Sequence, residues 1–430
     1  MKKVTFIGGG SAKFVGEVVK DIFSFEELRD IRITLMDIDA ERLARAERLI
    51  RKMIADRHLA ATVETTLDQR QALEGADYVI VTVMVGGFKH YRSDGEIPAK
   101  YGVLPTVGDT IGPGGVFRLV RTAPVLRQIA ANLRQVSPHA LVLNYANPLA
   151  MNVWGLLEYG HERTVGLCHS VQWAVRGIAG WLGLPHEAVR YTAGGINHVD
   201  FYLTLEHQGH SLYPELLARK DEILAREPKE RVRFELLEYL GYWPAEGPHH
   251  QSEYYPWFRK NQAVVDSYGV ESFWGYNFDR QLNQNLAAEV EDMITGRKPI
   301  RTERGIEYGA FIIHAIESGE PFLFYGNVRN KGLIENLPPD AVVEAPCHAG
   351  SSGLFPCRVG RLPPQLAAVM TPHVHVHRMA IEAVKQRDRR LLCHAIAADP
   401  LTGAILTLPE VRRMVDELAE ANKDYMQDWA

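Results

Sequence analysis

Strand-like and helix-like segments alternate up to about residue 170, and this alternation limits the folds open to the chain more than any other feature. The strand-like segments are short and either β-branched or continuously apolar: residues 3–7, 31–36, 78–85, 139–144 and 164–167. Residues 15–25 and 40–55 lie between them and repeat apolar side chains with helical spacing. Strands that alternate with helices predict an α/β fold with a doubly wound parallel sheet.

The turn after the first strand-like segment carries the cluster Gly8-Gly9-Gly10-Ser11, and the second segment ends at Asp37. Gly8 and Gly10 allow a tight turn and the close approach of a pyrophosphate, which the N–H groups of the following helix can bind. A carboxylate at Asp37 can bind the ribose 2′-hydroxyl of NAD. Lys13 stands where a third glycine would complete the usual fingerprint. We expect Gly8, Gly10, Ser11 and Asp37 to bind NAD in a Rossmann-like domain. The alternative is a different phosphate ligand on the same fold.

The pattern changes after residue 196. A hairpin is expected from residue 201, and longer helix-like segments follow it: residues 216–240, 279–294, 304–318, 365–389 and 409–426. Residues 241–257 are rich in Gly, Pro, His and Tyr and predict a loop, whose aromatic and histidine cluster either carries function or seals a domain edge. We therefore expect an NAD-binding domain over residues 1–196. Residues 197–430 are expected to form a mixed, helix-rich domain for substrate binding, metal binding and oligomerisation.

Charge balance and cysteine content bear on the partners and the compartment. Lys and Arg number 48 and Asp and Glu 53, and the net charge of −5 gives no reason to expect a nucleic-acid or anionic-membrane partner. The apolar stretch 78–88 is too short to span a bilayer, and the apolar run at residues 4–7 is too short for a signal peptide. Four cysteines are too few to staple 430 residues, so we expect reduced thiols and a cytoplasmic location.

Cys168 follows a strand-like segment, at the edge of the sheet where ligands bind in open α/β folds. Further along, His198 ends the run Gly-Gly-Ile-Asn-His. A thiolate and an imidazole from two separate elements could hold a divalent metal with open positions. A Cys-His dipeptide by itself distinguishes nothing, because it occurs again at 347–348 and 393–394, so only position favours Cys168.

Three alternating histidines, His373, His375 and His377, also invite a metal interpretation. In a helix, however, His375 cannot share a face with the other two. We therefore expect a packed or solvated helix face here.

Several motifs, in their order and spacing over most of the chain, match a known family. They are residues 35–39 (Leu-Met-Asp-Ile-Asp), 109–115 (Asp-Thr-Ile-Gly-Pro-Gly-Gly), 143–148 (Leu-Asn-Tyr-Ala-Asn-Pro), 166–172 (Gly-Leu-Cys-His-Ser-Val-Gln), 195–198 (Gly-Ile-Asn-His) and 253–258 (Glu-Tyr-Tyr-Pro-Trp-Phe), with the N-terminal glycine cluster. Together they resemble glycoside hydrolase family 4, and within it the melibiase-type α-galactosidases. The resemblance implies bound NAD, a divalent metal that is usually Mn²⁺, and hydrolysis without the usual pair of carboxylates.

The resemblance also implies an order of chemical steps. NAD takes a hydride from C3 of the sugar, which acidifies the proton on C2, and a metal held by Cys168 and His198 stabilises the enediolate. A tyrosine removes the C2 proton and the aglycone leaves from C1 by elimination. Water then adds to C1 and the hydride returns to C3, so NAD is regenerated in every turnover.

The family's motifs assign further roles in this sequence. The resemblance makes Tyr254 the base, with Tyr255 as the neighbouring rival, and Asp109 the acid that increases the basicity of the tyrosine. Asn147 matches a sugar-binding asparagine, and Arg280 is a weaker candidate for a sugar contact.

His169 departs from the phosphosugar-specific members, which carry an aspartate there as general acid. Imidazole suits proton transfer at neutral pH, so His169 is expected either to protonate the leaving oxygen or to contact the sugar. The motif Cys-His-Ser-Val at 168–171 favours an unphosphorylated α-galactoside such as melibiose or raffinose. An α-galacturonide is the second substrate to consider, because a related branch carries the same motif.

Two further classes of function stay open on the same residues. One is a sugar or hydroxy-acid dehydrogenase, which would share the fold and accumulate NADH. The second is a non-catalytic dinucleotide sensor, against which the pair Cys168 and His198 argues. A homodimer or homotetramer is expected in each case.

Overall fold

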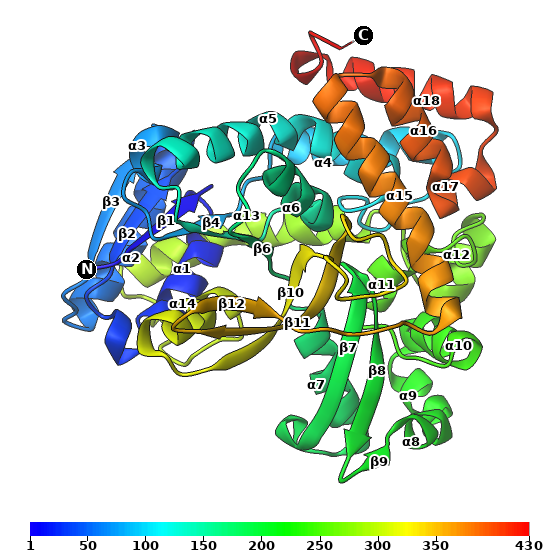
Figure 1. Cartoon of the computed structure of the whole chain (residues 1–430), viewed down its shortest axis with the longest axis horizontal. Coiled ribbons are helices and arrows are strands. Elements are labelled where there is room, and N and C mark those ends of the chain that lie inside the picture. The colour runs from blue at the N-terminus through cyan, green and yellow to red at the C-terminus, as the bar shows by residue number, and fades with distance from the viewer. Residues whose placement is uncertain (430) are drawn as a thin grey trace.

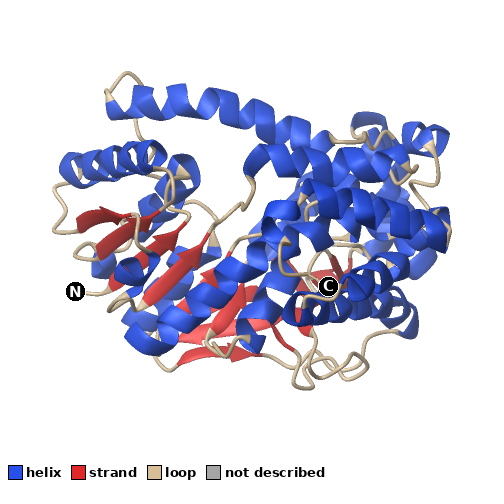
Figure 2. Cartoon of the chain, turned by 90° about the horizontal axis from the view of Figure 1, so that it is seen from above, coloured by secondary structure: helices blue, strands red, loops and turns tan. Residues whose placement is uncertain are grey.

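The first six strands form a parallel sheet in the order β3-β2-β1-β4-β5-β6. In this computed structural model, which describes residues 1–429, they are β1 (Lys3–Ile7), β2 (Arg32–Met36), β3 (Thr62–Thr66), β4 (Tyr78–Val81), β5 (Leu141–Asn144) and β6 (Thr164–Gly166). The connecting helices are α1 (Ala12–Ile22), α2 (Ala40–Asp56), α3 (Gln69–Leu73), α4 (Gly87–Lys100), α5 (Gly112–Val136) and α6 (Leu149–Glu158). Helices pack on both sides of the row of strands (Figure 2), which confirms the doubly wound α/β fold.

Local chemistry explains why these segments form these elements. Every residue of β1, β4 and β5 is buried, which accounts for their mainly apolar sequences. Helix α2 begins at Asp39, whose carboxylate accepts hydrogen bonds from two backbone N–H groups of the first turn. The side chains that α2 buries recur at helical spacing: Leu43, Ala46, Leu49, Ile50 and Met53.

The other strands extend the same sheet beyond β6 with antiparallel pairing, in the order β10-β11-β7-β8-β9. Their bounds are β7 (Val189–Ile196), β8 (Val199–His207), β9 (His210–Ser211), β10 (Phe322–Arg329), β11 (Val342–Gly350) and β12 (Gly353–Pro356), the last paired with β11. The hairpin predicted from residue 201 is confirmed as β8 and β9, which pair around residues 206–211. The sequence pattern gave no indication of β7, β10 and β11. The sheet is therefore continuous across residue 196, and the division into two domains there stays a prediction.

The second half of the chain is otherwise helical (Figure 1). Its helices are α7 (Ser170–Leu182), α8 (Tyr213–Ala218), α9 (Lys220–Arg226), α10 (Arg231–Leu240), α11 (Pro248–Gln251), α12 (Gln262–Tyr268), α13 (Trp274–Ile294), α14 (Tyr308–Ser318), α15 (Pro364–Gln386), α16 (Arg389–Ala398), α17 (Pro400–Ile405) and α18 (Leu408–Ala421). Five short 3₁₀ turns complete the chain: η1 (Glu26–Leu28), η2 (His186–Ala188), η3 (Pro228–Glu230), η4 (Ser252–Tyr254) and η5 (Lys423–Tyr425). Within residues 1–429, none of the helices combines the length and the apolar character needed to cross a membrane.

The predicted loop over residues 241–257 is wrong in part. Residues 248–254 form α11 and η4, because Pro248 has the fixed φ that suits the first helical position. The helical geometry places His250 and Tyr254, four residues apart, on one side of the segment, which matters for the site.

Candidate active site

A cavity of about 790 Å³ lies at the carboxyl edge of the parallel sheet. Ser11 and Phe14, at the start of α1, line one end of it, and Cys168, His198 and Glu246 line the other. Ligands bind at this edge in doubly wound folds. The cavity therefore joins the expected dinucleotide turn to the expected metal ligands.

The glycine turn is held by its neighbours in the sheet. The N–H groups of Gly8 and Gly9 donate to the Met36 carbonyl at 2.9 and 2.7 Å, and the Gly10 N–H donates to Asp37 Oδ2 at 2.8 Å. A Cβ atom at Gly10 would lie 2.7 Å from that same oxygen, so a side chain cannot be accommodated there without a shift. Helix α1 has no side-chain cap and no acidic residue in its first turn. This helix end fits an anionic group such as a pyrophosphate.

The structure explains why Lys13 can stand where the dinucleotide fingerprint has its third glycine. Lys13 forms an ion pair with Glu289 of α13 at 3.3 Å. The close packing of α1 on α2 comes instead from Gly16, where a Cβ atom would lie 2.9 Å from Leu49 Cδ2.

His198 lies at the tip of the β7–β8 hairpin. Ile196 pairs with Val199, so Asn197 and His198 form a two-residue turn, and His198 has a positive φ of 65°. Only the second central residue of this turn is left-handed, and that position favours Gly or Asn. A histidine there accepts backbone strain, which is typical of functional positions.

Three side chains converge at this tip. His198 Nε2 lies 3.4 Å from Cys168 Sγ and 3.2 Å from Glu246 Oε2. Among residues 1–429, they form a group whose sulfur, nitrogen and oxygen atoms all lie within 4.8 Å of one another. One ion could therefore be bound by all three. Cys168 and His198 were predicted as ligands, whereas Glu246 was missed, and its one sequence signal is a place in the histidine-rich segment whose role stayed open.

The electrostatics of the ligand set suit a cation. Burial, together with the nearby Glu344 and Glu246 carboxylates, raises the pKa of Cys168 well above its ordinary value. Burial lowers the pKa of His198 to about 4, so its imidazole is neutral and can act as a ligand. A thiol gives up its proton to a bound metal ion, and the ion's charge would offset the surrounding carboxylates.

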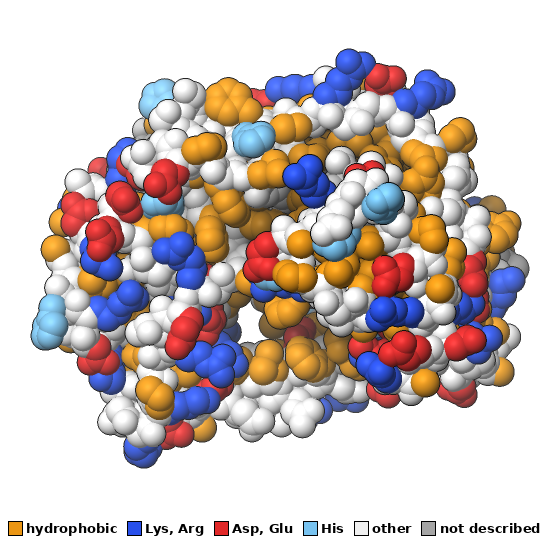
Figure 3. Space-filling view, turned by 90° about the horizontal axis from the view of Figure 1, so that it is seen from below, with side chains coloured by type: hydrophobic (Ala, Val, Ile, Leu, Met, Phe, Trp, Pro, Cys, Tyr) orange, Lys and Arg blue, Asp and Glu red, His pale blue; other side chains and the backbone are white. Residues whose placement is uncertain are grey.

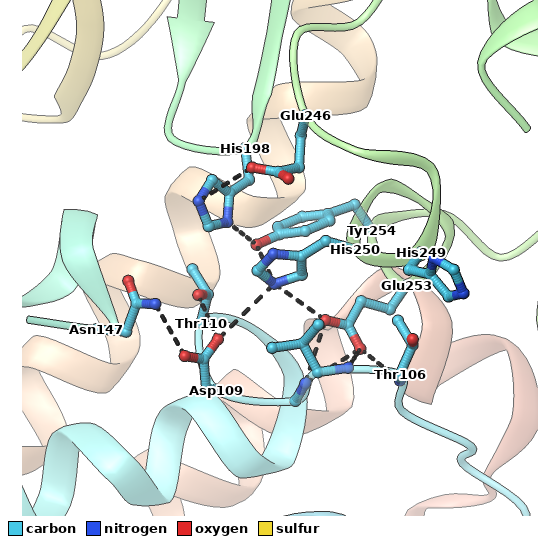
Figure 4. A network of polar contacts seen from close by, with 12 residues as sticks. Thr106, Asp109, Thr110, Asn147, His198, Glu246, His249, His250, Glu253 and Tyr254 are labelled. Carbon is cyan, nitrogen blue, oxygen red and sulfur yellow. Dashed lines mark hydrogen bonds and ion pairs between the residues drawn. The ribbon is translucent and has the colours of Figure 1, made fainter. Parts of the chain in front are cut away.

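Tyr254 connects the ligand set to a second group of polar side chains (Figure 4). Its hydroxyl lies 3.0 Å from His198 Nδ1 and 3.5 Å from His250 Nε2. Tyr254 is fully buried and lies behind these two histidines, which line the cavity. Burial, with the nearby carboxylates of Glu253, Glu246 and Asp109, raises the pKa of Tyr254 well above its ordinary value.

His250 places a positive charge beside that phenol. Its Nε2 lies 3.1 Å from Glu253 Oε1 and 3.8 Å from Asp109 Oδ1. Burial opposes protonation, but the hydrogen bond to Glu253 and the surrounding carboxylates outweigh it and raise the pKa of His250 to about 9. The Glu253 carboxylate is fixed by the backbone N–H groups of Thr106, Val107 and Gly108 at 2.9 to 3.2 Å. His250 and Glu253 were not among the predicted site residues.

Asp109 lies on the loop before α5. It accepts hydrogen bonds from Thr110 Oγ1 and Asn147 Nδ2, both at 2.8 Å, and Arg118 approaches to 3.4 Å. Burial would raise the pKa of Asp109, but Arg118 and the other partners hold it below its ordinary value, so the group is an anion. The Gly-Pro-Gly-Gly motif explains the loop's position, because a Cβ atom at Gly114 would lie 2.2 Å from the Gly108 carbonyl oxygen.

The two candidate tyrosines point to different surroundings. Tyr255 stacks on Trp257 with ring centroids 5.2 Å apart, and its hydroxyl accepts a hydrogen bond from Gln251 at 2.8 Å. Tyr254 alone of the pair bonds to the cavity-lining histidines. The backbone carbonyl of Tyr254 is held by His373 Nε2 at 2.9 Å.

The remaining predicted residues differ in position. His169 and Asn147 line the cavity, and His169 Nδ1 lies 3.6 Å from Glu307 Oε1, whose influence raises the histidine's pKa against the effect of burial. Arg280 is exposed on α13 and does not line the cavity, whereas its neighbour Asp279 does. A sugar contact by Arg280 stays a prediction without a supporting contact among the described residues.

The other histidine and cysteine motifs lie away from the cavity. Cys347 is buried in β11 while His348 is exposed, and Cys393 and His394 lie on α16. On α15, His373 and His377 are buried and His375 is exposed, which confirms that His375 does not share their face.

Two family models match the chain. Residues 3–184 match the family 4 glycosyl hydrolase model, and residues 193–402 match the model of the C-terminal domain of the same family.

Curated relatives extend over the full length. An α-galactosidase of Bacillus subtilis is 37% identical over 442 residues, with all of both chains covered. An α-galactosidase of Rhizobium meliloti is 36% identical, covering 100% of this chain and 90% of the relative. An α-galacturonidase of Lachnoclostridium phytofermentans is 30% identical, covering 99% of this chain and 97% of the relative.

A solved structure shares the fold. A 6-phospho-α-glucosidase from gut microorganisms, crystallised with NAD and Mn²⁺, is 20% identical and superimposes with a TM-score of 0.84. All of both chains is covered.

Proposed function

Because the chain belongs to glycosyl hydrolase family 4, we propose that it hydrolyses α-galactosides with NAD and a divalent metal ion, Mn²⁺ in first place. The observation that carries the proposal is the shared cavity. One end fits a pyrophosphate, and the other gathers a thiol, an imidazole and a carboxylate around one point. The two α-galactosidases at 36% and 37% identity support the substrate class, and the structure crystallised with NAD and Mn²⁺ supports the cofactors.

The residues present fit both groups. Cys168, His198 and Glu246 would hold the metal ion, while the turn from Gly8 to Ser11, together with Asp37, would hold NAD. When bound, NAD supplies reversible oxidation of the sugar and the metal supplies Lewis-acid polarisation of the adjacent sugar oxygens. The binding, orientation and proton transfers fall to the side chains.

Tyr254 is the proposed base for the C2 proton. A phenol needs help to act as a base, because its ordinary pKa is about 10. The help comes from positive charge: His250 lies 3.5 Å from the hydroxyl, and its raised pKa keeps it charged at neutral pH. Asp109 holds the other side of this network and orients Asn147, which would contact a sugar hydroxyl.

His169 is the proposed acid for the leaving oxygen. Its side chain is 53% exposed, lines the cavity and follows the metal ligand Cys168 directly. Glu307, 3.6 Å away, favours the protonated form from which a proton can be donated.

An α-galacturonide is the second candidate substrate. The chain is 30% identical to an α-galacturonidase, and an exposed lysine, Lys229, lines the cavity. An ammonium group of this kind would pair with a C6 carboxylate, which a galactoside lacks.

The test is a panel of nitrophenyl glycosides with NAD⁺, Mn²⁺ and a thiol reductant. We expect release of nitrophenol from the α-galactoside, little from the α-galacturonide or a 6-phospho-α-glucoside, and no net NADH. Accumulation of NADH in proportion to substrate would favour a dehydrogenase, and binding of NAD without turnover of any glycoside would favour a sensor. Full activity of chelated, NAD-stripped protein would overturn the proposal.

A further inference from the structure

A tryptophan is exposed in the wall of the active-site cavity. Trp173 of α7 is 54% exposed and lines the cavity. Within residues 1–429 its ring stacks on no other aromatic ring, and its indole N–H makes no hydrogen bond. Three other aromatic side chains at this cavity are already stacked on one another: His249 on Trp274 at 4.5 Å, and Trp274 on Phe278 at 5.3 Å. An indole face left open in a cavity of this size is a typical place for a ligand to bind.

Three cavity-lining residues lie in a row along α7 and the residue that precedes it. The backbone N–H of Trp173 donates to the backbone carbonyl of His169 at 3.0 Å, which places the two residues one helical turn apart. Gly177 follows one turn later, and a Cβ atom there would meet nothing within 4 Å. Side chains four residues apart lie on one helix face. The row therefore runs from His169 beside the metal ligands, over a bare indole, to open space.

The order of these residues along the helix matches the order of the glycosidic oxygen and the aglycone in a substrate. His169 is the residue proposed to protonate the glycosidic oxygen, so the part of the substrate beyond that oxygen lies further along α7. One helical turn is about 5.4 Å, comparable with the length of one sugar ring. The C–H groups on a pyranose face can pack against an indole, while the ring's hydroxyls stay in contact with water.

We propose that Trp173 and Gly177 form an aglycone subsite that stacks a second sugar ring. The enzyme then prefers α-galactosides whose leaving group is itself a hexose over those with a small alkyl leaving group. This inference rests on the proposed α-galactosidase function and on His169 facing the glycosidic oxygen. In it Trp173 sets specificity and takes no part in the chemistry.

The experiment compares kcat/KM for melibiose with kcat/KM for methyl α-galactoside, whose aglycone is too small to reach Trp173. In the Trp173→Ala variant we expect the value for melibiose to fall about tenfold, as loss of an aromatic stacking contact predicts. The value for methyl α-galactoside should change less than about twofold. Gly177→Leu keeps the indole and fills the open space, so it should lower the ratio of kcat/KM for melibiose to kcat/KM for methyl α-galactoside. Leucine favours a helix more than glycine does, so this variant should keep α7 intact.

Tyr239 supplies a matched control. It is 82% exposed and lies outside this cavity, so Tyr239→Ala should leave the ratio unchanged. Trp173→Ala and Gly177→Leu variants with the wild-type ratio would overturn the subsite. An equal loss of kcat/KM on both substrates would overturn it too. So would variants that change oligomeric state in gel filtration and keep the wild-type ratio of the two kcat/KM values. If the wild type cleaves neither galactoside, the proposed function fails. If it cleaves both and the ratio does not move, only the subsite fails.

Seen from below, the molecule is hollowed, and hydrophobic side chains gather around the hollow (Figure 3).

Discussion

The two ends of the active-site cavity are built in opposite ways. At the glycine turn, polar groups find partners on the neighbouring strand: Met36 and Asp37 accept the N–H groups of residues 8–10. At the metal end, Cys168 and His198 come from two separate segments, and Glu246 and Tyr254 come from a third, residues 241–257. There, burial and neighbouring carboxylates raise the pKa of the thiol and of the phenol well above their ordinary values.

This difference shows which end needs its ligand. A turn whose hydrogen bonds are made within the fold keeps its shape without a dinucleotide. At the metal end His250 supplies one positive charge, yet the thiol and the phenol stay protonated among the buried carboxylates. A bound cation would favour their anionic forms. Changes at the metal end should therefore affect catalysis far more than changes at the turn.

Removal of a metal ligand should have the largest effect. We expect Cys168→Ala and Glu246→Gln each to lower kcat by about 10⁴-fold, because Lewis-acid stabilisation contributes several kcal/mol. NAD affinity should stay unchanged, and bound Mn²⁺, measured by elemental analysis, should be lost. Cys393→Ser, on α16, is the control and should change neither. Undiminished Mn²⁺ binding by Glu246→Gln would remove Glu246 from the ligand set.

Loss of the phenol should come next. Tyr254→Phe is expected to lower turnover by about 10³-fold, the scale of general acid–base catalysis, and to keep NAD and Mn²⁺ bound. In wild type, product formed in D₂O should carry deuterium at C2, because the base exchanges its proton with solvent. Tyr255→Phe is the matched control and should retain activity. A fully active Tyr254→Phe would move the role to another residue, and product without C2 deuterium would argue against elimination.

Helix α15 packs against the metal end through His373, which bonds to the Tyr254 carbonyl. Its buried histidines should make the stability of the protein sensitive to acid. Burial lowers the pKa of His377 to about 3, below the ordinary value of about 6.5 in the unfolded chain. The unfolded state therefore binds the proton first as the pH falls, and the free energy of unfolding decreases. For one such histidine the loss between pH 7 and pH 5 is about 2 kcal/mol. Urea unfolding of His377→Leu should show a correspondingly weaker pH dependence than wild type. His375→Leu, exposed on the same helix, should follow wild type, and equal slopes for all three proteins would refute the assignment.

The smallest effect is expected at the turn. Asp37→Ala removes the acceptor of the Gly10 N–H and the expected partner of the ribose, and NAD should bind about tenfold more weakly, the loss of one or two hydrogen bonds. Calorimetric titration with NAD measures this, and Mn²⁺ affinity should not change. Glu41→Ala, exposed in the first turn of α2, is the control. If Asp37→Ala weakened Mn²⁺ binding as much as NAD binding, the two ends of the cavity would not differ in the way described.

Much of this arrangement could be predicted from short stretches of sequence. Most of the parallel strands are recognisable as mainly apolar runs, because their residues are buried. The edge strand β3 is largely polar and was not predicted. The Gly-Pro-Gly-Gly motif has a local backbone reason, visible in the residue types. Strands β10 and β11 were missed, because their place between β6 and β7 depends on pairing with segments more than a hundred residues away.

By itself the sequence determined the α/β fold, the glycine turn and the choice of Cys168 and His198 as candidate ligands. All of these depend on residue types within a few positions, or on family motifs along the chain. Only the tertiary structure brought Glu246 to the metal end, placed His250 against Tyr254 and separated Tyr254 from Tyr255. The physical reason is that ion pairs, buried charge and shared ligands are set by distance in space, and a carboxylate at residue 246 gives no local sign of which side chain it will meet.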